Sequence, residues 1–396
     1  MNKKIYLFSL SIGLLSTLAG IFIWIKIYNT QLLTPVNIES EFSFLKILGT
    51  SKKQKKLVYG FLPYWNLKKV ELQKELTHLS YFSLTIQADG SVRLTEEGFT
   101  EPGYSKLQSD EFLDLLQDLD KQNTKLEIVL TQFNNDSIVH FLNSEKSQDK
   151  LLETLDSVLL AYPFSGVNID IEYSGESTDK LRSNFVNFVE KIDRHLDEKD
   201  PNIKLSIDVY GSAASRKMIW DLEQIGKHVD YVIMMAYDYH RRNSVVSGPV
   251  APLFGGDSLW DSDITEHLND LIDQVPSNKI LLGVPFYGYE WRTTSREDRE
   301  NTYPNSGSTA SFERIQEILN QKEKLEVQEH WNDDALSPYI TYKQNGAIFT
   351  IYYENSRSLF YKLDLIEQLD LAGVAIWALG YEGDNRELWD VIENKL

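Results

Sequence analysis

The chain has 396 residues, 42% of them hydrophobic and 12% aromatic, which suits one large globular domain or two ordinary ones. Its formal net charge of −19 argues against a nucleic-acid partner, because phosphate binding requires a basic face. The absence of cysteine excludes disulfides, thiolate metal sites and cysteine nucleophiles. The seven histidines have no paired metal-ligand spacing and there is no phosphate-binding loop, so we expect no metal and no cofactor.

The N-terminus contains an apolar run, Ile5–Ile25, with two lysines before it and one after it. A helix over this run would span roughly 31 Å, the thickness of the hydrocarbon core of a bilayer. We therefore expect residues 1–27 to be an uncleaved transmembrane signal anchor that places the rest of the chain outside the cytoplasm. Cleavage near Ala19, which would give a secreted protein, is the alternative. Residues 28–56 have the composition of a polar linker.

From residue 57 onward, short apolar segments alternate with amphipathic ones. The apolar segments have the runs of Val, Ile and Leu typical of parallel strands buried on both faces, at residues 57–62, 79–85, 126–132, 166–172, 203–209, 230–237, 279–285 and 372–378. Helical spacing occurs at residues 110–119, 147–160, 180–196, 214–225, 264–275 and 359–369. This alternation predicts an α/β protein with a (β/α)8 TIM barrel over residues 57–396. An open doubly wound sheet is the alternative, although its usual Gly-rich phosphate turn is missing.

The stretch before the last predicted strand, from about residue 292 to 355, is too long for a single helix. We expect it to form a small α+β insertion with a helix at 311–319 and strands at 339–342 and 347–353.

Carboxylates gather at the end of the fourth predicted strand. Asn168, Asp170 and Glu172 alternate with apolar residues and therefore share one face. Two acids and an amide are costly to bury without a purpose, and neighbouring carboxylates raise each other's pKa, which keeps a proton donor available near neutral pH. Because TIM-barrel active sites lie at the C-terminal ends of the strands, we predict Asp170 and Glu172 to be catalytic.

The other strand ends contribute acids and aromatic side chains, a combination that suits sugars, because ring faces stack on aromatics and hydroxyls meet acids. Together with Asn168, the candidate substrate contacts are Phe61, Trp65, Asp208, Met235, Asp238, Tyr287 and Trp377, and Tyr237 is a third candidate catalytic residue.

These motifs resemble glycoside hydrolase family 18. Residues 165–172 are similar to its D-G-x-D-x-D-x-E strand, residues 235–238 to its M-x-Y-D, and residues 60–65 to its G-Y-Y-x-x-W, and Trp377 matches its last-strand Trp. The motifs follow in order over about residues 57–390.

The chain departs from the general pattern at three places. Ser165 and Asn168 replace two Asp residues, and residues 131–135 replace S-x-G-G. The segment around Asn168 resembles the spore-cortex branch of peptidoglycan N-acetylglucosaminidases and also chitobiase-like members, and residues 331–339 resemble the same spore-cortex branch. Because Asn cannot ionise, we expect a lower pKa for Asp170 than in relatives with Asp at that position, and an acidic limb set mainly by Asp170 and Glu172.

The resemblance implies substrate-assisted, retaining hydrolysis of β-1,4 bonds at N-acetylglucosamine. Glu172 would be the general acid and later the base, Asp170 would orient the substrate's acetamide, and Tyr237 would hydrogen-bond it. Asp238 and Trp377 would hold the sugar at the cleavage site.

Peptidoglycan is the first expected substrate and chitin the second. A catalytically inactive, lectin-like barrel tethered at the cell surface is the alternative function, and the presence of Glu172 favours the enzyme. A scaffold protein acting through the insertion is a third reading. We expect a monomer that binds an N-acetylglucosamine-containing glycan.

Overall fold

The computed structural model describes residues 55–396 except 97 and 257. The predicted anchor at 1–27 and nearly all of the predicted linker lie outside the described residues. Among the helices of this described part, none has both the length and the apolar character needed to cross a membrane.

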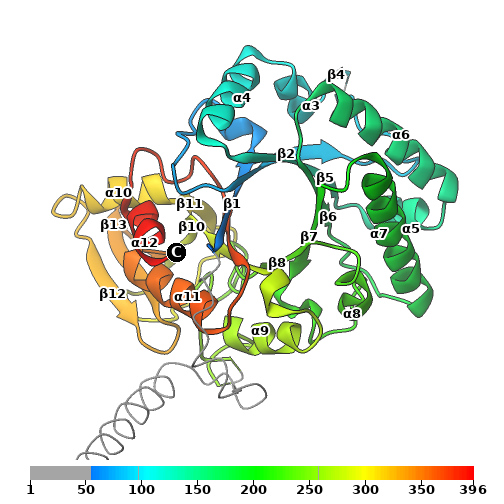
Figure 1. Cartoon of the computed structure of the whole chain (residues 1–396). Helices are drawn as coiled ribbons and strands as arrows, with labels where there is room; N and C mark the ends of the chain where they lie inside the picture. Colours follow the sequence, from blue (N-terminus) through cyan, green and yellow to red (C-terminus); the bar gives the residue numbers. More distant parts are fainter. Residues whose placement is uncertain (1–54, 97, 257) are drawn as a thin grey trace, which may run out of the picture. The chain divides into compact units, whose positions relative to one another are not determined.

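Eight parallel strands close into a barrel, in the order β1, β2, β5, β6, β7, β8, β9 and β15 (Figure 1). Their bounds are β1 Leu57–Pro63, β2 His78–Thr85, β5 Lys125–Gln132, β6 Gly166–Ile171, β7 Lys204–Tyr210, β8 Tyr231–Met235, β9 Ile280–Pro285 and β15 Gly373–Trp377. The ring closes where β1 pairs with β15, from Leu57 opposite Gly373 to Phe61 opposite Trp377. The predicted TIM barrel is confirmed, and the open sheet is excluded.

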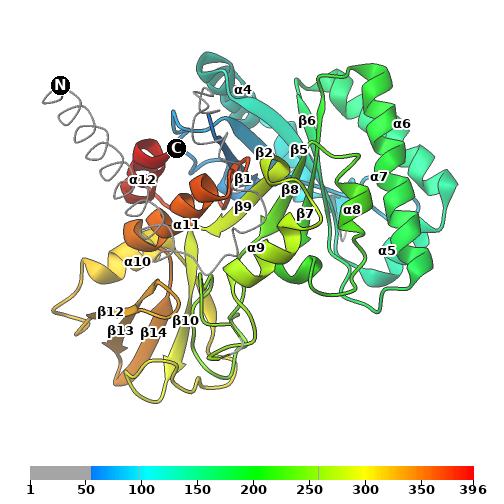
Figure 2. The same cartoon turned by 60° about the horizontal axis from the view of Figure 1, so that its bottom comes forward.

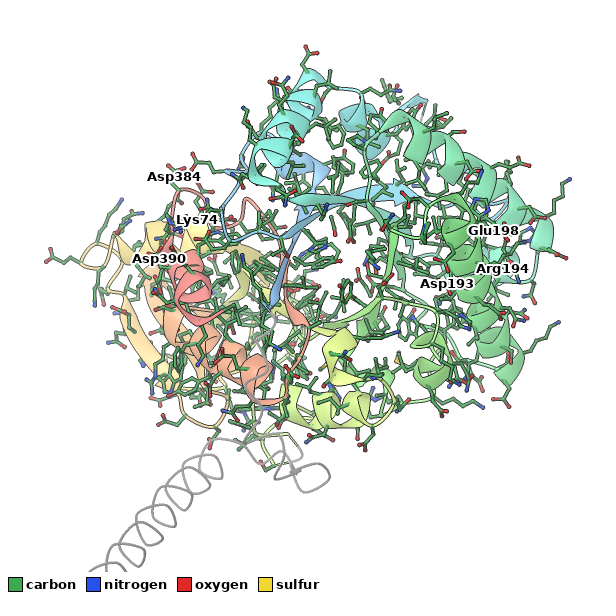
Figure 3. The ribbon with its side chains drawn as sticks, viewed as in Figure 1. Lys74, Asp193, Arg194, Glu198, Asp384 and Asp390 are labelled. Atoms are coloured by element: carbon green, nitrogen blue, oxygen red, sulfur yellow. The ribbon has the colours of Figure 1, made fainter. Side chains whose placement is uncertain are left out.

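Helices surround the barrel on its outside (Figures 1 and 2). They are α3 Pro102–Leu107, α4 Asp110–Gln122, α5 Asn135–Leu142, α6 Glu145–Ala161, α7 Asp179–Lys199, α8 Leu222–Ile225, α9 Ile264–Ile272, α11 Ser356–Gln368 and α12 Glu387–Lys395, while α10 Phe312–Leu319 belongs to the insertion between β9 and β15. In α7, Thr178 caps the N-terminus by accepting from the Leu181 N–H at 3.2 Å. The helix buries an apolar stripe that includes Phe185, while Arg194 and Glu198 face outward (Figure 3).

One predicted helix, residues 214–225, is wrong except for its last turn, α8. The preceding backbone is irregular because its carbonyls find partners outside a helix. The Arg182 guanidinium of α7 donates to the carbonyls of Met218 and of buried Trp220, the latter at 2.8 Å. Tertiary contacts therefore override the local helical spacing.

The insertion between β9 and β15 is a five-stranded antiparallel sheet in the order β11–β10–β14–β13–β12, with α10 against it. The strands are β10 Tyr287–Thr293, β11 Ser308–Ser311, β12 Gln328–Asn332, β13 Ser337–Gln344 and β14 Ala347–Tyr352. The sheet lies beside the barrel (Figure 2). It begins at Tyr287, earlier than the expected residue 292, because β10 follows β9 after only one residue, Phe286.

A chain of hydrogen bonds runs through the barrel interior from its N-terminal end. The Tyr59 hydroxyl donates to Glu127 Oε1 at 2.6 Å, and Ser206 donates to Glu127 Oε2 at 3.5 Å. Ser206 accepts in turn from Asn168 Nδ2 at 3.0 Å. Gly166 leaves room for the Glu127 side chain, since a Cβ there would lie 2.7 Å from its carboxyl carbon. Both carboxylate oxygens of Glu127 and the Ser206 hydroxyl therefore have hydrogen-bond partners in the barrel interior.

Candidate active site

A cavity of about 1020 Å³ opens at the C-terminal ends of the barrel strands. Nine of the predicted site residues line it, namely Trp65, Asp170, Glu172, Asp208, Met235, Tyr237, Asp238, Tyr287 and Trp377. Two others, Asn168 and Phe61, do not reach its wall. The described residues include no group of three or more His, Asp or Glu side chains arranged to hold a metal ion.

Asp170 lies at the end of β6, where its side chain is only 4% exposed. The next polar position, Glu172, continues the strand pairing, because its N–H donates to the Gln132 carbonyl at 3.0 Å. Burial raises the pKa of Asp170 well above its usual range, and the charges of Asp208 and Glu172 raise it further. Asp170 Oδ1 is buried and has no hydrogen-bond partner among the described residues.

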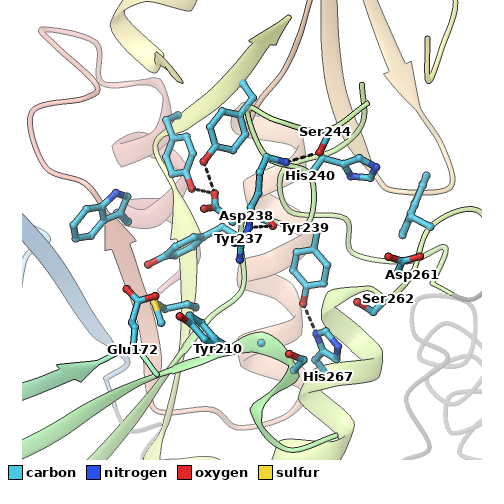
Figure 4. Close-up of a pocket in the computed structure, with 18 of the residues that line it drawn as sticks. Glu172, Tyr210, Tyr237, Asp238, Tyr239, His240, Ser244, Asp261, Ser262 and His267 are labelled. Atoms are coloured by element: carbon cyan, nitrogen blue, oxygen red, sulfur yellow. Dashed lines mark hydrogen bonds between the residues drawn. The ribbon is translucent and has the colours of Figure 1, made fainter. Parts of the chain in front are cut away.

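Glu172 is half-buried and lies beside Tyr210 (Figure 4). The Tyr210 side chain hydrogen-bonds the Glu172 carboxyl group. Burial raises its pKa, the Tyr210 hydroxyl and the Arg241 charge oppose that effect, and Asp238 adds to it. The net pKa of Glu172 is raised. A carboxyl group with this environment at the rim of a cavity can donate a proton near neutral pH.

Asn168 lies one layer below the cavity and is fully buried. Its amide donates to Asp208 Oδ1 at 2.9 Å and to Ser206 at 3.0 Å. Its predicted position as a substrate contact is therefore corrected: it holds Asp208, the residue that lines the cavity. Strand β6 directs Asn168 into the barrel interior, three residues before the strand ends at Ile171.

The expectation that Asn168 gives Asp170 a lower pKa than in relatives with Asp at that position stays a prediction, and Asp170 still has charged neighbours. Asp208, on β7, supplies the like charge that Asn168 lacks, and it raises the pKa of Asp170 more than Glu172 does. The pKa of Asp208 is itself raised well above its usual range, by burial first and despite the Asn168 hydrogen bond. Three carboxylates thus determine the electrostatics of this site.

Asp238 is held by the insertion. The Tyr289 hydroxyl donates to Asp238 Oδ1 at 2.9 Å, and the Tyr287 hydroxyl donates to the same atom (Figure 4). Asp238 has a φ of 63°, a left-handed conformation that Asp tolerates better than most residues. Tyr237 packs edge-on against Tyr287, with ring centroids 6.2 Å apart. Strand β10 of the insertion therefore fixes the end of β8.

Trp377 contributes a ring face to the cavity. Phe82 meets this ring edge-on at 4.8 Å, and Phe61 lies 6.0 Å away. Phe61 is 2% exposed and packs in the barrel interior, so it supports Trp377 and does not line the cavity. Trp65, by contrast, is 47% exposed at the cavity mouth.

Several cavity residues were not among the predicted ones. Tyr210 ends the same strand as Asp208, so its position in the sequence could have identified it. Tyr289 alternates with Tyr287 on β10, but that strand was not recognised. Tyr239 hydrogen-bonds His267 of α9 at 2.9 Å (Figure 4), a pairing that depends on the long loop after β8 and has no sequence signal.

Known proteins share this architecture. The sequence profile "Glycosyl hydrolases family 18" matches residues 49–382. The putative sporulation-specific glycosylase YdhD of Bacillus subtilis is 25% identical over 252 residues, which cover 62% of this chain and 54% of YdhD. Chitinase B of Serratia marcescens is 23% identical over 388 residues, which cover 80% of this chain and 75% of that one.

Among solved structures, the spore cortex-lytic enzyme SleL of Bacillus megaterium matches with a TM-score of 0.66 and 20% identity, over 88% of this chain and 75% of that one. This likeness supports the fold. The family profile spans most of the barrel and the insertion. The chain belongs to glycosyl hydrolase family 18.

Proposed function

We propose that this protein hydrolyses β-1,4 bonds at N-acetylglucosamine by substrate-assisted, retaining catalysis. The observation that carries the proposal is the pair Asp170 and Glu172 at the end of β6, both facing the cavity. One of them has an unpartnered buried oxygen, and the other has a raised pKa that suits a proton donor.

In the first step, the Glu172 carboxyl gives its proton to the glycosidic oxygen while the substrate's acetamide oxygen attacks the anomeric carbon. The glycosidic C–O bond breaks, and an oxazolinium ion forms. Asp170 accepts a hydrogen bond from the acetamide N–H through its unpartnered Oδ1 and stabilises the positive charge. The Glu172 carboxylate then takes a proton from the attacking water, which opens the ring and restores the acid.

The remaining cavity groups hold the sugar. Tyr237 donates to the acetamide oxygen, and Trp377 stacks against the sugar ring. Asp238, fixed by the two tyrosines of β10, accepts from a sugar hydroxyl.

Peptidoglycan is the proposed substrate, and chitin is the second candidate. YdhD is described as a sporulation-specific glycosylase and SleL as a spore cortex-lytic enzyme, which supports a cell-wall glycan, while chitinase B supports chitin. We also propose that the apolar run Ile5–Ile25 anchors the chain and places the catalytic domain outside the cytoplasm, where peptidoglycan lies.

The test is release of reducing ends from chitotetraose and from purified peptidoglycan, by the full chain and its Glu172→Gln variant. We expect activity on at least one glycan and its collapse in the variant, with circular dichroism to establish that the variant is folded. If both proteins bind a glycan and neither cleaves it, hydrolysis is refuted and a lectin-like role replaces it.

A further inference from the structure

Three arginines line the active-site cavity of this strongly acidic protein. Arg216 follows β7, Arg241 follows β8 and Arg299 lies between β10 and β11 of the insertion. We call these three residues the arginine wall. None of them forms a salt bridge with any carboxylate in the described part of the chain, although the protein has 59 acidic residues.

Some arginines outside the cavity pair with carboxylates. Arg314 lies 2.9 Å from Glu290, and Arg386 lies 3.0 Å from Glu75. An arginine left unpaired at a cavity that substrate must enter has its charge available for a ligand.

Protein contacts position two of the wall residues without neutralising them. Arg241 Nε donates to the Asp238 carbonyl at 3.2 Å, and no partner occupies its terminal nitrogens among the described residues. The Arg299 guanidinium lies over the Trp260 ring, 5.7 Å from its centroid, and donates to the Leu259 carbonyl. Both contacts are to uncharged groups, so they fix a guanidinium without forming an ion pair with it.

The charges of the arginine wall affect the pKa values of groups around the cavity. Arg241 opposes the rise in the pKa of Glu172, Arg216 contributes to the lowered pKa of His267, and burial is the main cause of both net shifts. One exposed carboxylate, Asp261, lines the same cavity, and the other acidic side chains of the cavity lie at the strand ends. The three arginines thus line a cavity that also holds five carboxylates, of which Asp261 is the exposed one.

We infer that the arginine wall binds carboxylates of the substrate. The inference rests on the proposed function and narrows it to N-acetylglucosamine glycans that carry carboxylates, as the lactyl and peptide groups of peptidoglycan do. A guanidinium presents parallel N–H donors that match a carboxylate. Chitin is uncharged and cannot use these groups.

The experiment compares native peptidoglycan with peptidoglycan whose carboxylates have been amidated with carbodiimide. The full chain prefers the native glycan, and the preference weakens with added salt. In the double variant Arg216→Gln/Arg299→Gln, the ratio of kcat/KM on native to amidated glycan falls about ten-fold, the size expected for a charged hydrogen bond. Arg242→Gln is the matched control, because Arg242 is exposed next to Arg241 and does not line the cavity; it keeps the wild-type ratio.

Equal rates on the two glycans would refute the inference that the arginine wall binds carboxylates. So would the same kcat/KM ratio of native to amidated glycan in wild type and double variant. Either result leaves the hydrolase proposal intact. Loss of hydrolysis on these glycans and on chitotetraose overturns the hydrolase proposal instead. In that case, co-sedimentation with the two insoluble glycans still decides the inference. Stronger wild-type binding to the native glycan, lost in the double variant, supports the arginine wall, and equal binding refutes it.

Discussion

Both ends of the barrel interior bury carboxylates, but the two ends differ in the hydrogen-bond partners that they give to the carboxylate oxygens. At the N-terminal end, burial raises the pKa of Glu127 to about 7, and Tyr59 and Ser206 donate to its two oxygens. At the C-terminal end, burial also raises the pKa of Asp170, but one of its oxygens has no partner and the side chain lines a cavity. Burial alone therefore does not identify a functional acid; an unsatisfied acceptor at a cavity does.

Asn168 stands between the two ends. Its amide reaches Ser206 on the side of Glu127 and Asp208 on the side of the cavity. Its own carbonyl oxygen, like Asp170 Oδ1, is buried without a partner among the described residues. The amide thus supports a carboxylate on the neighbouring strand without adding a charge of its own.

Apart from the general acid Glu172, the largest effect is expected at Asp170. Asp170→Asn removes the negative charge that stabilises the oxazolinium ion, so kcat falls about 100-fold or more. Initial rates on the cleaved glycan, with the variant shown to fold, measure this. A kcat within two-fold of the wild type would remove Asp170 from the mechanism.

A smaller effect is expected at Asp208. Asp208→Asn removes the like charge that raises the pKa of Asp170, and Asp170 must be ionised to accept the acetamide N–H. The acidic limb of the pH–rate profile therefore moves to lower pH, by about one unit. Asp261→Asn, which removes an exposed carboxylate from the cavity, should leave the limb in place. An unmoved limb in Asp208→Asn would mean that Asp208 does not act on Asp170.

The opposite shift is expected from Asn168→Asp. The variant places a carboxyl group where the amide now donates to Asp208 at 2.9 Å, so the pKa values of the cluster rise and the acidic limb moves to higher pH. The pH–rate profile again measures it. A profile identical to that of the wild type would contradict the role given to Asn168.

The smallest effect on activity, and a distinct one on stability, is expected at Glu127. In the unfolded chain Glu127 titrates near its ordinary pKa of 4.5 and in the folded chain near about 7, so between these values the unfolded state binds fewer protons and stability falls as pH rises. Because Gln does not titrate, Glu127→Gln removes this loss of stability with rising pH. In urea unfolding, the free energy of unfolding of Glu127→Gln relative to that of the wild type should therefore rise by about 3 kcal/mol from pH 4 to pH 8. A difference that is independent of pH would show that Glu127 has an ordinary pKa.

The barrel strands could be predicted because most of them are near-continuous apolar runs, and the acids of β6 because side chains two apart share a face. Tyr289 could not be predicted to hold Asp238, because it depends on an insertion strand that reads as an extension of β9. The helix expected at residues 214–225 failed because Arg182 satisfies that backbone from a distant helix. The predicted membrane anchor lies outside the described residues and stays a prediction.

The most direct test makes the same change at both ends of the barrel. Rates of the full chain are measured for Glu172→Gln and for Glu127→Gln on one cleaved glycan. The account predicts a loss of about 1000-fold for the first variant, the contribution of a general acid, and at most about two-fold for the second. Comparable losses in two folded variants would contradict the claim that the cavity end carries the chemistry while the other end only holds the barrel together.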